Sequence, residues 1–419
     1  TPYDDDTADE EWYYFKSNGK RAENEKITYK GKTYYFDTDG IMLTGWVNTG
    51  DGTSAVNEAT GYDADHTFYC DETGARVEGA WVKDVEPGTD DDDADADEYW
   101  YYLKKATGKP ATGKQSNISG QIYLFNESGQ MQYGWVARSD SKTKKFVQLD
   151  KEDDEQAMIT LAEEEDSEVY YCGDEDDGHA KKNKWLKTWL PDDTNEEEDD
   201  MKWFWFDKNG KLYRASGSDA VKAQKYKLEE GKLVYDGSEI TGVDKKKVNS
   251  KDYWFRPDGA MISKFYEING NMYYFGGSDD GSMKTGSQSV KDNTGDTYKF
   301  YFETKTGANK GAGVTGNQSN KLYYYGMLIQ ADDYKYQVAN IDGVKFIVNS
   351  NGSIQHSYDT TYKEDGDELI TVDKSVEKGG KAAYNTTGAY KYGFTAGVQS
   401  KVDDVDMSKF IEGKNGFTK

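Results

Sequence analysis

Short runs of aromatic residues recur along this chain, each followed by a polar turn and a second apolar segment. The first run, WYYF at residues 12–15, precedes the turn SNG at residues 17–19. The clearest copy is TYYFDTDGIMLTGW at residues 33–46. Strand-forming aromatics, a turn closed by glycine and a short apolar run are the pattern of a β-hairpin. Their recurrence predicts a stack of hairpins with rows of aromatic pockets rather than one deep cleft.

The residue just before each aromatic triplet, named here the lead residue, marks the repeats. The shortest steps between lead residues are about 20 residues, which suits two strands and a tight turn but is too short for a βαβ unit. The lead residues are Trp12, Thr33, Thr67, Trp100, Ile122, Val169, Trp203, Lys225, Asp252, Met272, Lys299, Leu322 and Lys345.

Glycine closes most of the predicted turns. Seven turns place it where the backbone needs a positive φ, which glycine adopts without steric cost. These residues are Gly19, Gly40, Gly74, Gly129, Gly210, Gly259 and Gly352. A shorter turn precedes the triplet at residues 30–32, 119–121, 269–271 and 342–344. The alternation of two turns predicts a continuous meander of hairpins.

Three acidic runs, residues 90–98, 150–168 and 192–200, interrupt the repeats. Like charges repel one another and stay solvated, so these runs are predicted to be loops. They lack the ligand spacing of an EF-hand, so no metal site is predicted. The predicted fold is all-β, an elongated solenoid of stacked β-hairpin repeats with acidic loop insertions over residues 1–358. Residues 359–419 lack a clear triplet and are predicted to be degenerate capping repeats or the start of another domain.

The composition supports this fold and excludes several partners. Only 35% of the 419 residues are hydrophobic, yet the chain has 34 Tyr, 16 Phe and 10 Trp. Disordered chains are poor in aromatic residues, so an ordered protein is predicted. The formal net charge of −26 argues against nucleic acid and anionic lipid as partners. No stretch is apolar enough to span a bilayer, and membrane insertion is not predicted.

The two cysteines, Cys70 and Cys172, stand where other triplets have Phe. This equivalence favours a role as small apolar strand residues over a disulfide or a reactive thiol. We therefore expect both thiols to be free.

The segments WYYF…NG, TYYFDTDGIMLTGWV, YLFNESGQMQYGWV and YYFGGSDDGSMKTG resemble cell-wall-binding repeats. That family includes choline-binding, glucan-binding and clostridial toxin repeats, and the resemblance covers roughly residues 10–355. It implies a solenoid of β-hairpins in a secreted or cell-surface protein attached to a Gram-positive cell wall. The implied partners are cell-wall teichoic acid or glycan, or a host protein or glycoprotein.

The resemblance to choline-binding members also implies site residues. In those members, aromatic residues of neighbouring repeats and often a Met surround the ligand, which is held by cation–π attraction and methyl contacts. The matching positions are Trp46 with Phe68 and Tyr69, Trp81 with Trp100 and Tyr102, Trp135 with Tyr170 and Tyr171, and Met42 and Met131. Each ring is also a candidate for packing between hairpins, because a chain poor in aliphatic residues must build its core from rings.

The sequence departs from the family pattern in two ways. Only Trp12, Trp100 and Trp203 put Trp at the lead position, and no Gly-Trp pair follows Trp135. Complete choline pockets are therefore expected to be few, which leaves glycan stacking and protein contact open. Trp185 and Trp189 are expected in a packed insertion rather than in a pocket.

No catalytic motif fits its required context. Residues 108–114 match the spacing of a phosphate-binding loop, but Gln115 stands where Ser or Thr would hold magnesium. Residues 311–316 match a dinucleotide fingerprint, but no helix is predicted after either segment. The three histidines are isolated from one another. No enzymatic activity and no cofactor are predicted.

The sequence therefore predicts a non-catalytic bacterial surface protein that binds a cell-wall polymer, through choline or glycan, in aromatic pockets between hairpins. A second hypothesis is an adhesin that binds a host protein or glycoprotein, such as immunoglobulin or mucin, through the solenoid surface and acidic loops. A third is a structural spacer for another domain.

Overall fold

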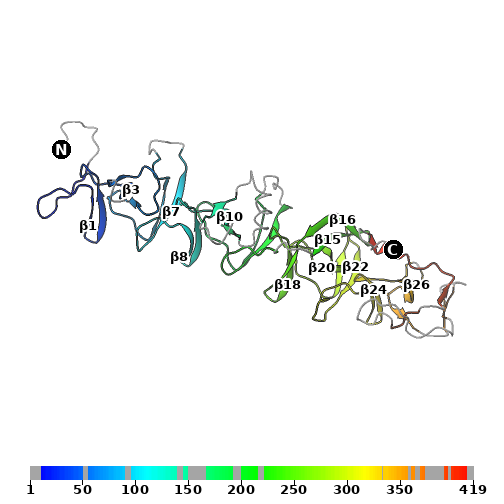
Figure 1. The fold of residues 1–419 in the computed structure, drawn as a ribbon. Helices are drawn as coiled ribbons and strands as arrows, with labels where there is room; N and C mark the ends of the chain where they lie inside the picture. Colours follow the sequence, from blue (N-terminus) through cyan, green and yellow to red (C-terminus); the bar gives the residue numbers. More distant parts are fainter. Residues whose placement is uncertain are drawn as a thin grey trace. The chain divides into compact units, whose positions relative to one another are not determined.

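The structure, a computed structural model, divides into two compact units, Thr1–Tyr213 and Arg214–Lys419 (Figure 1). Within the described residues the fold is all-β, as predicted, and a short 3-10 helix, η2 (Met407–Lys409), is the exception. The described residues are 11–50, 55–89, 96–138, 145–149, 167–191, 200–215, 221–332, 334–356, 360–363, 369–372, 391–394 and 398–412.

The first unit is a succession of small antiparallel sheets, each built on one hairpin (Figure 1). Its strands are β1 (Glu25–Tyr29), β2 (Lys32–Phe36), β3 (Gly45–Asn48), β4 (Asn57–Glu58), β5 (Thr67–Cys70), β6 (Ala80–Val85), β7 (Glu98–Leu103), β8 (Gly113–Ile118), β9 (Gln121–Phe125), β10 (Gly134–Arg138), β11 (Val147–Gln148), β12 (Glu168–Cys172), β13 (Lys184–Thr188) and β14 (Lys202–Phe206). The sheets are β1–β2, β4–β3–β5, β6–β7, β8–β9, β11–β10–β12 and β13–β14.

The second unit has wider sheets. Its strands are β15 (Lys222–Glu229), β16 (Lys232–Thr241), β17 (Asp244–Val248), β18 (Lys251–Phe255), β19 (Phe265–Ile268), β20 (Asn271–Tyr274), β21 (Gly286–Lys291), β22 (Thr297–Phe302), β23 (Gly316–Gln318), β24 (Lys321–Tyr324), β25 (Met327–Leu328), β26 (Tyr336–Ile341), β27 (Val344–Asn349), β28 (Ile354–Gln355), β29 (Thr361–Lys363), β30 (Leu369–Val372), β31 (Val398–Ser400) and β32 (Ile411–Glu412). The sheet orders are β20–β19–β15–β16–β32, β21–β22–β25–β24–β23, β17–β18, β26–β27–β28 and β29–β30–β31.

The predicted turns have the backbone that they require. All seven predicted turn glycines have φ between 71° and 89°. The shorter turns place two successive residues at positive φ, as at Lys30 (49°) and Gly31 (78°), which is the backbone of a two-residue hairpin loop. In the longer turns an Asp or Asn side chain replaces a backbone acceptor. Asp37 Oδ1, for example, accepts the N–H of Asp39 at 2.9 Å and of Ile41 at 2.8 Å.

One backbone hydrogen bond recurs between successive repeats of the first unit. The donor lies two residues after the turn glycine and is named here the seat residue; the acceptor is the carbonyl of the preceding lead residue. Met42 thus donates to Trp12 at 2.8 Å. The same bond joins Arg76 to Thr33, Met131 to Trp100, Ala180 to Ile122 and Leu212 to Val169. Pro110 holds the seat position of the repeat led by Trp100 and has no N–H to donate.

The side chain of the seat residue packs against the turn glycine of the next repeat. A Cβ placed on Gly74 would overlap Sδ of Met42, and one on Gly178 would overlap Sδ of Met131. The positive φ therefore favours glycine at these turns, and an added Cβ would also force the methionine side chain to shift. One residue, through its N–H and its side chain, fixes the register of three successive repeats.

Aromatic rings build the core of the first unit, as the composition predicts. Tyr35, Tyr101 and Tyr170 are among the largest fully buried side chains. Cys70 and Cys172 are free and buried, 1% and 0% exposed, which confirms their role as apolar strand residues. Burial raises the pKa of the Cys70 thiol to about 12, and it raises the pKa of the Cys172 thiol as well.

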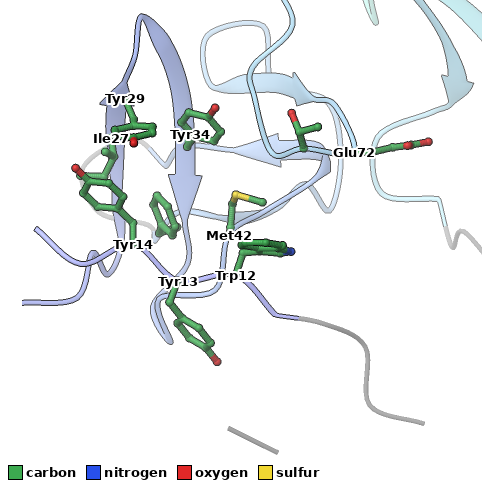
Figure 2. Close-up of a pocket in the computed structure, with 10 residues that line it drawn as sticks. Trp12, Tyr13, Tyr14, Ile27, Tyr29, Tyr34, Met42 and Glu72 are labelled. Carbon is green, nitrogen blue, oxygen red and sulfur yellow. The ribbon is translucent and has the colours of Figure 1, made fainter. Parts of the chain in front are cut away.

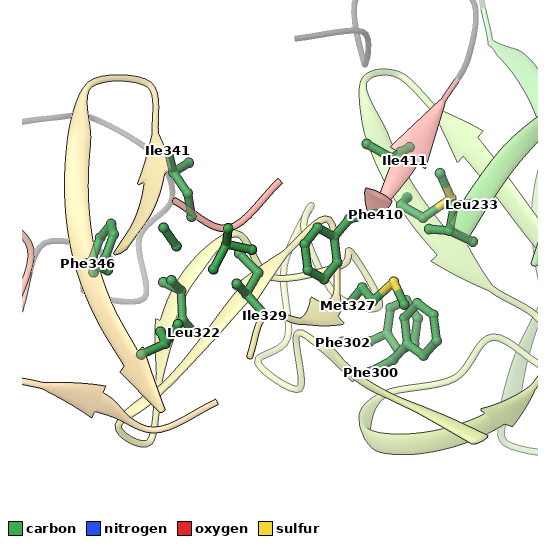
Figure 3. Packing of buried hydrophobic residues seen from close by; sticks show 14 of the residues in the cluster. Leu233, Phe300, Phe302, Leu322, Met327, Ile329, Ile341, Phe346, Phe410 and Ile411 are labelled. Carbon is green, nitrogen blue, oxygen red and sulfur yellow. The ribbon is translucent and has the colours of Figure 1, made fainter. Parts of the chain in front are cut away.

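The largest hydrophobic cluster lies in the second unit (Figure 3). Phe300 and Phe302 stack at 6.1 Å with their rings nearly parallel. Phe410 and Ile411, close to the C-terminal end of the described chain, belong to the same cluster. Much of residues 359–419 lies outside the described residues, so the predicted boundary at residue 358 stays a prediction.

Candidate ligand-binding cages

Two pockets of the first unit are built alike from successive repeats. Cage A has a volume of about 510 Å³ and is lined by Trp12, Tyr13, Tyr14, Ile27, Tyr29, Tyr34, Phe36, Met42, Glu72 and Thr73. Cage B has a volume of about 220 Å³ and is lined by Trp81, Trp100, Tyr123, Met131, Asp176 and Asp177.

The two cages share equivalent positions of the repeat. Each has a Trp lead residue, the first ring of the next triplet, the seat Met of that triplet's repeat and the turn of a third repeat. In cage A these are Trp12, Tyr34, Met42 and the turn residues Glu72 and Thr73. In cage B they are Trp100, Tyr123, Met131 and the turn residues Asp176 and Asp177. The same plan at two places indicates a site that the repeat itself specifies.

The hairpin β6–β7 forms one wall of cage B. Its register sets Trp81 opposite Tyr102 and Lys83 opposite Trp100. Side chains two residues apart on a strand share a face, so all four side chains lie on one face of the hairpin. The Trp81 ring is perpendicular to that of Trp100, with centroids 6.4 Å apart, and its centroid is 5.2 Å from that of Tyr102. Trp100 and Trp81 therefore offer differently oriented π surfaces to one space.

The next repeat supplies the facing wall. The ring centroid of Tyr123 is 4.8 Å from that of Trp81, and Phe125 stacks on Trp81 at 5.8 Å. Met131 is 6% exposed, and its N–H bonds the Trp100 carbonyl at 2.8 Å. Three rings and a thioether thus surround a small space, as a bound quaternary ammonium group requires.

Carboxylates of the third repeat stand at the mouth of cage B. Trp100 Nε1 donates to Asp176 Oδ1 at 3.2 Å, and Lys83 Nζ lies 3.7 Å from the same oxygen. Partial burial disfavours the charge of Asp177, but hydrogen bonds from His179 and Lys181 outweigh it and lower the pKa of this carboxyl group. Asp177 is therefore ionised at neutral pH, and Lys181 and Lys83 balance the charges of Asp177 and Asp176 at the mouth.

Cage A follows the same plan with more open rings. Trp12 is 63% exposed and Tyr29 is 45% exposed. Tyr14 lies 5.9 Å from Tyr29 between ring centroids. Figure 2 shows the side chains of Tyr13 and Glu72 pointing away from Trp12, so the space itself is bounded by the other rings and by the seat Met. Cage A is the larger and more apolar of the two.

Two of the three tryptophans that the resemblance assigned to pockets, at or near a Gly-Trp pair, are buried in the structure. Trp46 is 8% exposed, and its Nε1 donates to the Val85 carbonyl at 3.0 Å. Trp135 is 6% exposed, and its Nε1 donates to the Trp189 carbonyl at 2.8 Å. Trp46 and Trp135 occupy the same strand position in their hairpins as Trp81 does in β6. Of the three, Trp81 lines one of the two cages.

The remaining candidates divide between cage and core. Tyr69 packs edge-on against Trp46 at 5.0 Å, and Tyr171 against Trp135 at 5.2 Å. Phe68 and Tyr170 are buried, 8% and 0% exposed. Tyr102 contacts Trp81 without lining cage B. The structure thus brings together Trp81, Trp100 and Met131 in cage B and places Met42 in cage A.

Several cage residues were missed by sequence reasoning. Tyr34 and Tyr123 are each the first triplet residue of the repeat that follows one led by Trp. The order of the repeats along the sequence could therefore have indicated them. Asp176 comes from a third repeat, far from Trp100 in sequence, and only the stacking brings the two together. Trp185 lies in the hairpin strand β13 opposite Trp205 and not in an insertion, and it lines neither cage.

No metal centre was found in the described part of the chain, where no three His, Cys, Asp or Glu side chains form a group able to hold an ion. The acidic runs at residues 90–98, 150–168 and 192–200 fall mostly outside the described residues. Among the described residues no helix is long and apolar enough to cross a membrane.

Comparison with known families decides what the repeats are. Residues 6–39 match the model of the choline-binding repeat, and residues 246–261 match the model of a cell wall binding repeat. The chain carries cell-wall-binding repeats. The first match includes Trp12 and Tyr34 of cage A, and the second includes the hairpin strand β18.

The curated relatives are much longer proteins. Glucosyltransferase-S of Streptococcus mutans is 24% identical over 76% of this chain and 17% of its own length. Glucosyltransferase-I of Streptococcus downei is 25% identical over 98% of this chain and 24% of its own length. The chain therefore spans about a quarter or less of these relatives.

Solved structures from Streptococcus pneumoniae are also similar. The modular autolysin LytC, in complex with a synthetic peptidoglycan ligand, has a TM-score of 0.37 and 17% identity, covering 85% of this chain and 52% of its own. Choline binding protein F has a TM-score of 0.28 and 19% identity, covering 84% of this chain and 100% of its own.

Proposed function

We propose that this chain is a non-catalytic binding module of a secreted or surface protein of a Gram-positive bacterium, and that cages A and B bind quaternary ammonium groups such as the choline of a cell-wall polymer. The observation that carries the proposal is cage B, in which Trp81, Trp100, Tyr123 and Met131 surround about 220 Å³. A trimethylammonium group is bulky, weakly hydrated and charged, so it gains from ring faces and from nearby carboxylates at once.

Because each cation–π contact is weak, firm attachment to a polymer requires more than one cage. A cation over an aromatic face contributes about 0.5–2 kcal/mol, so a three-ring cage gives only modest affinity. Two cages on one polymer raise retention through effective concentration. The match of residues 6–39 to the choline-binding repeat supports the same ligand at cage A.

Titration calorimetry with choline tests the proposal directly. We expect Trp12→Ala and Trp100→Ala each to remove one class of site, with the circular dichroism spectrum unchanged. Phe15→Ala is a matched control, because Phe15 is 66% exposed in the same repeat as Trp12 but does not line cage A. Choline binding that survives in the Trp12→Ala, Trp100→Ala double variant would contradict the proposal.

A glycan is the second candidate ligand, and the openness of cage A favours it. The exposed rings of Trp12 and Tyr29 offer faces on which a sugar ring can stack. Two relatives are glucosyltransferases by name, so α-glucan is the polymer to test. Retention on α-glucan beads that is lost in Trp12→Ala but unaffected by free choline would favour the glycan at this cage.

We infer that the hairpins continue as a solenoid through the first unit. The support is the recurring bond from seat N–H to lead carbonyl, together with the contact of the seat side chain with the next turn glycine. Both contacts join neighbouring repeats, as in solenoids. Small-angle scattering of the first unit giving a compact, near-spherical particle would contradict this.

An adhesin that uses the acidic loops remains the alternative function. Deleting residues 151–166 and 192–199 separates the two ideas, because the cages contain none of these residues. Binding to host glycoprotein that disappears with the loops favours the adhesin. The non-catalytic proposal is checked with cell-wall and α-glucan substrates, on which hydrolysis or transfer above background would refute it.

A further inference from the structure

The joint between repeats recurs in the second unit, next to the hairpin β17–β18. The N–H of Met283 donates to the carbonyl of the lead residue Asp252 at 2.8 Å. This bond corresponds to the one from Met131 to Trp100 in cage B. A Cβ placed on Gly311 would come within 2.7 Å of Sδ of Met283, so the seat side chain again packs against the turn of a third repeat. Asp252 therefore holds a position equivalent to the lead residue of cage B.

Charged side chains at this position replace a ring of cage B and reverse one of its charges. The lead residue is Asp252 where cage B has Trp100. The residue just before the turn glycine of the third repeat is Lys310 where cage B has Asp177. The two replacements meet, because Lys310 Nζ donates to Asp252 Oδ2 at 2.8 Å. This position is therefore not a further copy of the aromatic cages.

Two more lysines come from strand β17. Its register sets Lys247 opposite Asp252 and Lys245 opposite Trp254. Residues two apart on a strand share a face, so both lysines lie on the same face of the hairpin as Asp252. Lys245 Nζ lies 3.9 Å from Asp252 Oδ2, the oxygen that Lys310 also contacts. Ammonium groups from two repeats thus converge on one carboxylate oxygen.

The cluster has an excess of positive charge, although the chain has a net charge of −26. Partial burial disfavours the charge of Asp252, but the hydrogen bond from Lys310 and the charges of the other two lysines outweigh it and lower the pKa of this carboxyl group. One negative charge therefore faces three positive charges at neutral pH. The Asp252 side chain is 8% exposed, whereas those of Lys245 and Lys310 are 38% and 31% exposed. The ammonium groups are thus accessible to an anion from solution, while the carboxylate is covered.

The donor set suits a phosphate group. The lysine ammonium is a compact point charge, whereas the planar fork of arginine is the better match for a carboxylate. A phosphate ester presents oxygens in several directions, so ammonium groups on different strands can contact it at once. Because Lys245 and Lys310 approach the same oxygen of Asp252, one phosphate group can reach both.

We propose that the second unit binds a phosphate ester group at the hairpin β17–β18, through Lys245, Lys247 and Lys310. The site is separate from cages A and B and does not depend on their ligand. Each contact is partly exposed, so each lysine contributes about fivefold or less to the affinity, and a single phosphate binds weakly.

Phosphorus NMR of glycerol phosphate titrated with the full chain tests the proposal, because exchange with a bound phosphate shifts and broadens the free signal. We expect saturable binding that Lys245→Met and Lys247→Met each weaken about fivefold. Lys246→Met is the matched control, since Lys246 lies between them on β17 and points to the other face of the hairpin. The same loss in all three variants, or in none, overturns the inference.

Asp252→Asn separates an anion site from a purely structural ion pair. Loss of the carboxylate releases Lys310 and raises the local positive charge, so we expect phosphate to bind about fivefold more tightly. Unchanged or weaker binding in a variant whose circular dichroism spectrum is that of the parent contradicts the inference. The exposed Lys245→Met and Lys247→Met variants give a result even where Asp252→Asn fails to fold.

Two comparisons define the ligand. Glucuronate, a sugar carboxylate, is titrated at equal ionic strength, and affinity equal to that of glycerol phosphate refutes recognition of phosphate. Inorganic phosphate and poly(glycerol phosphate) distinguish the sources of the group: tighter binding of the polymer that falls in Lys245→Met identifies a polymer, and equal binding per phosphate identifies the free group. Either result supports the inference.

The Trp12→Ala, Trp100→Ala double variant keeps the two proposals apart. We expect it to lose choline binding and to keep phosphate binding. Loss of phosphate binding in this variant would place the anion at the cages and overturn the inference. Choline binding without phosphate binding in the parent would refute the phosphate site and leave the proposed function intact.

Discussion

Both cages have a Trp as their lead residue. Thr67, Ile122 and Val169 are buried at this position, 0%, 5% and 1% exposed. Trp12 and Trp100 occupy the same position, and each lines a cage. Trp203, the third lead Trp, lines neither cage, so a Trp at this position does not form a cage by itself.

The buried thiols give a prediction at this scale. Because burial raises the pKa of Cys70 to about 12 and that of Cys172 as well, neither forms the reactive thiolate at pH 8. We expect no labelling by a thiol reagent in the native protein and two equivalents in urea. Rapid labelling of the folded chain would show that the triplet packing opens.

The second unit contains a carboxyl group whose protonation stabilises the fold. Burial, and to a lesser extent Glu239, raise the pKa of Glu267, which is 8% exposed. Gln224 is set opposite both residues on the central strand β15. Its Nε2 donates to Glu239 at 2.8 Å, and its buried Oε1 has no partner among the described residues. Glu267 Oε1 accepts the N–H of Gly270, which opposes the rise in pKa but does not cancel it.

The sign of the pH dependence follows from the raised pKa. The contribution of Glu267 is complete below its unfolded pKa of about 4.5 and is lost as pH rises through the higher folded value. Glu267→Gln keeps a neutral donor at all pH, so we expect it to stabilise the protein at pH 7 by about 1 kcal/mol and to leave stability at pH 4 nearly unchanged. Urea unfolding at both pH values measures this, and equal effects at the two would contradict it.

At the scale of elements, the turn glycine and the seat residue form the joint between repeats. A side chain at Gly178 meets Met131, whereas Gly134, at a similar φ of 62°, has open space around it. Both glycines suffer backbone strain when replaced, and only Gly178 adds overlap in the joint.

We expect Gly178→Ala to destabilise the first unit by about 2–4 kcal/mol and Gly134→Ala by about 1–2 kcal/mol. Displacement of Met131 also deforms cage B, so choline affinity is expected to fall in the first variant and not in the second. Urea unfolding and calorimetry measure the two effects. Equal destabilisation by both substitutions would show that the contact with Met131 does not matter.

The hairpins were predictable from sequence because their causes are local. Aromatic triplets and turn glycines specify strands and positive φ within about 20 residues. The cages were less predictable, because their walls come from three repeats. Nothing near Trp46 in the sequence shows that the Val85 carbonyl will cover it, and nothing near Trp100 points to Asp176. Burial between repeats depends on stacking, which a single repeat does not encode.

At the scale of the whole molecule, both cages belong to the first unit. We expect residues 1–213 alone, once circular dichroism and cooperative unfolding show them folded, to bind choline as the whole chain does at these two cages. Calorimetry compares the site number and affinity of the two proteins. Loss of binding in a folded first unit would show that the second unit completes the sites.

The presence of two cages also predicts avidity on a polymer. On purified choline-bearing wall, Trp12→Ala or Trp100→Ala alone is expected to weaken retention about 10- to 100-fold, far more than the change in binding of monomeric choline at the remaining cage. Co-sedimentation measures retention. Loss in simple proportion to site number would indicate that the cages act independently.

Met131 bonds the preceding lead residue, packs against the next turn and lines cage B, so under the proposed function it also contacts the ligand. A ligand in cage B would touch three successive repeats and could bind only while these repeats keep their register. Ligand binding and folding are therefore linked by mass action. A chain attached to its polymer should consequently resist heat, proteases and mechanical extension better than the same chain free in the medium.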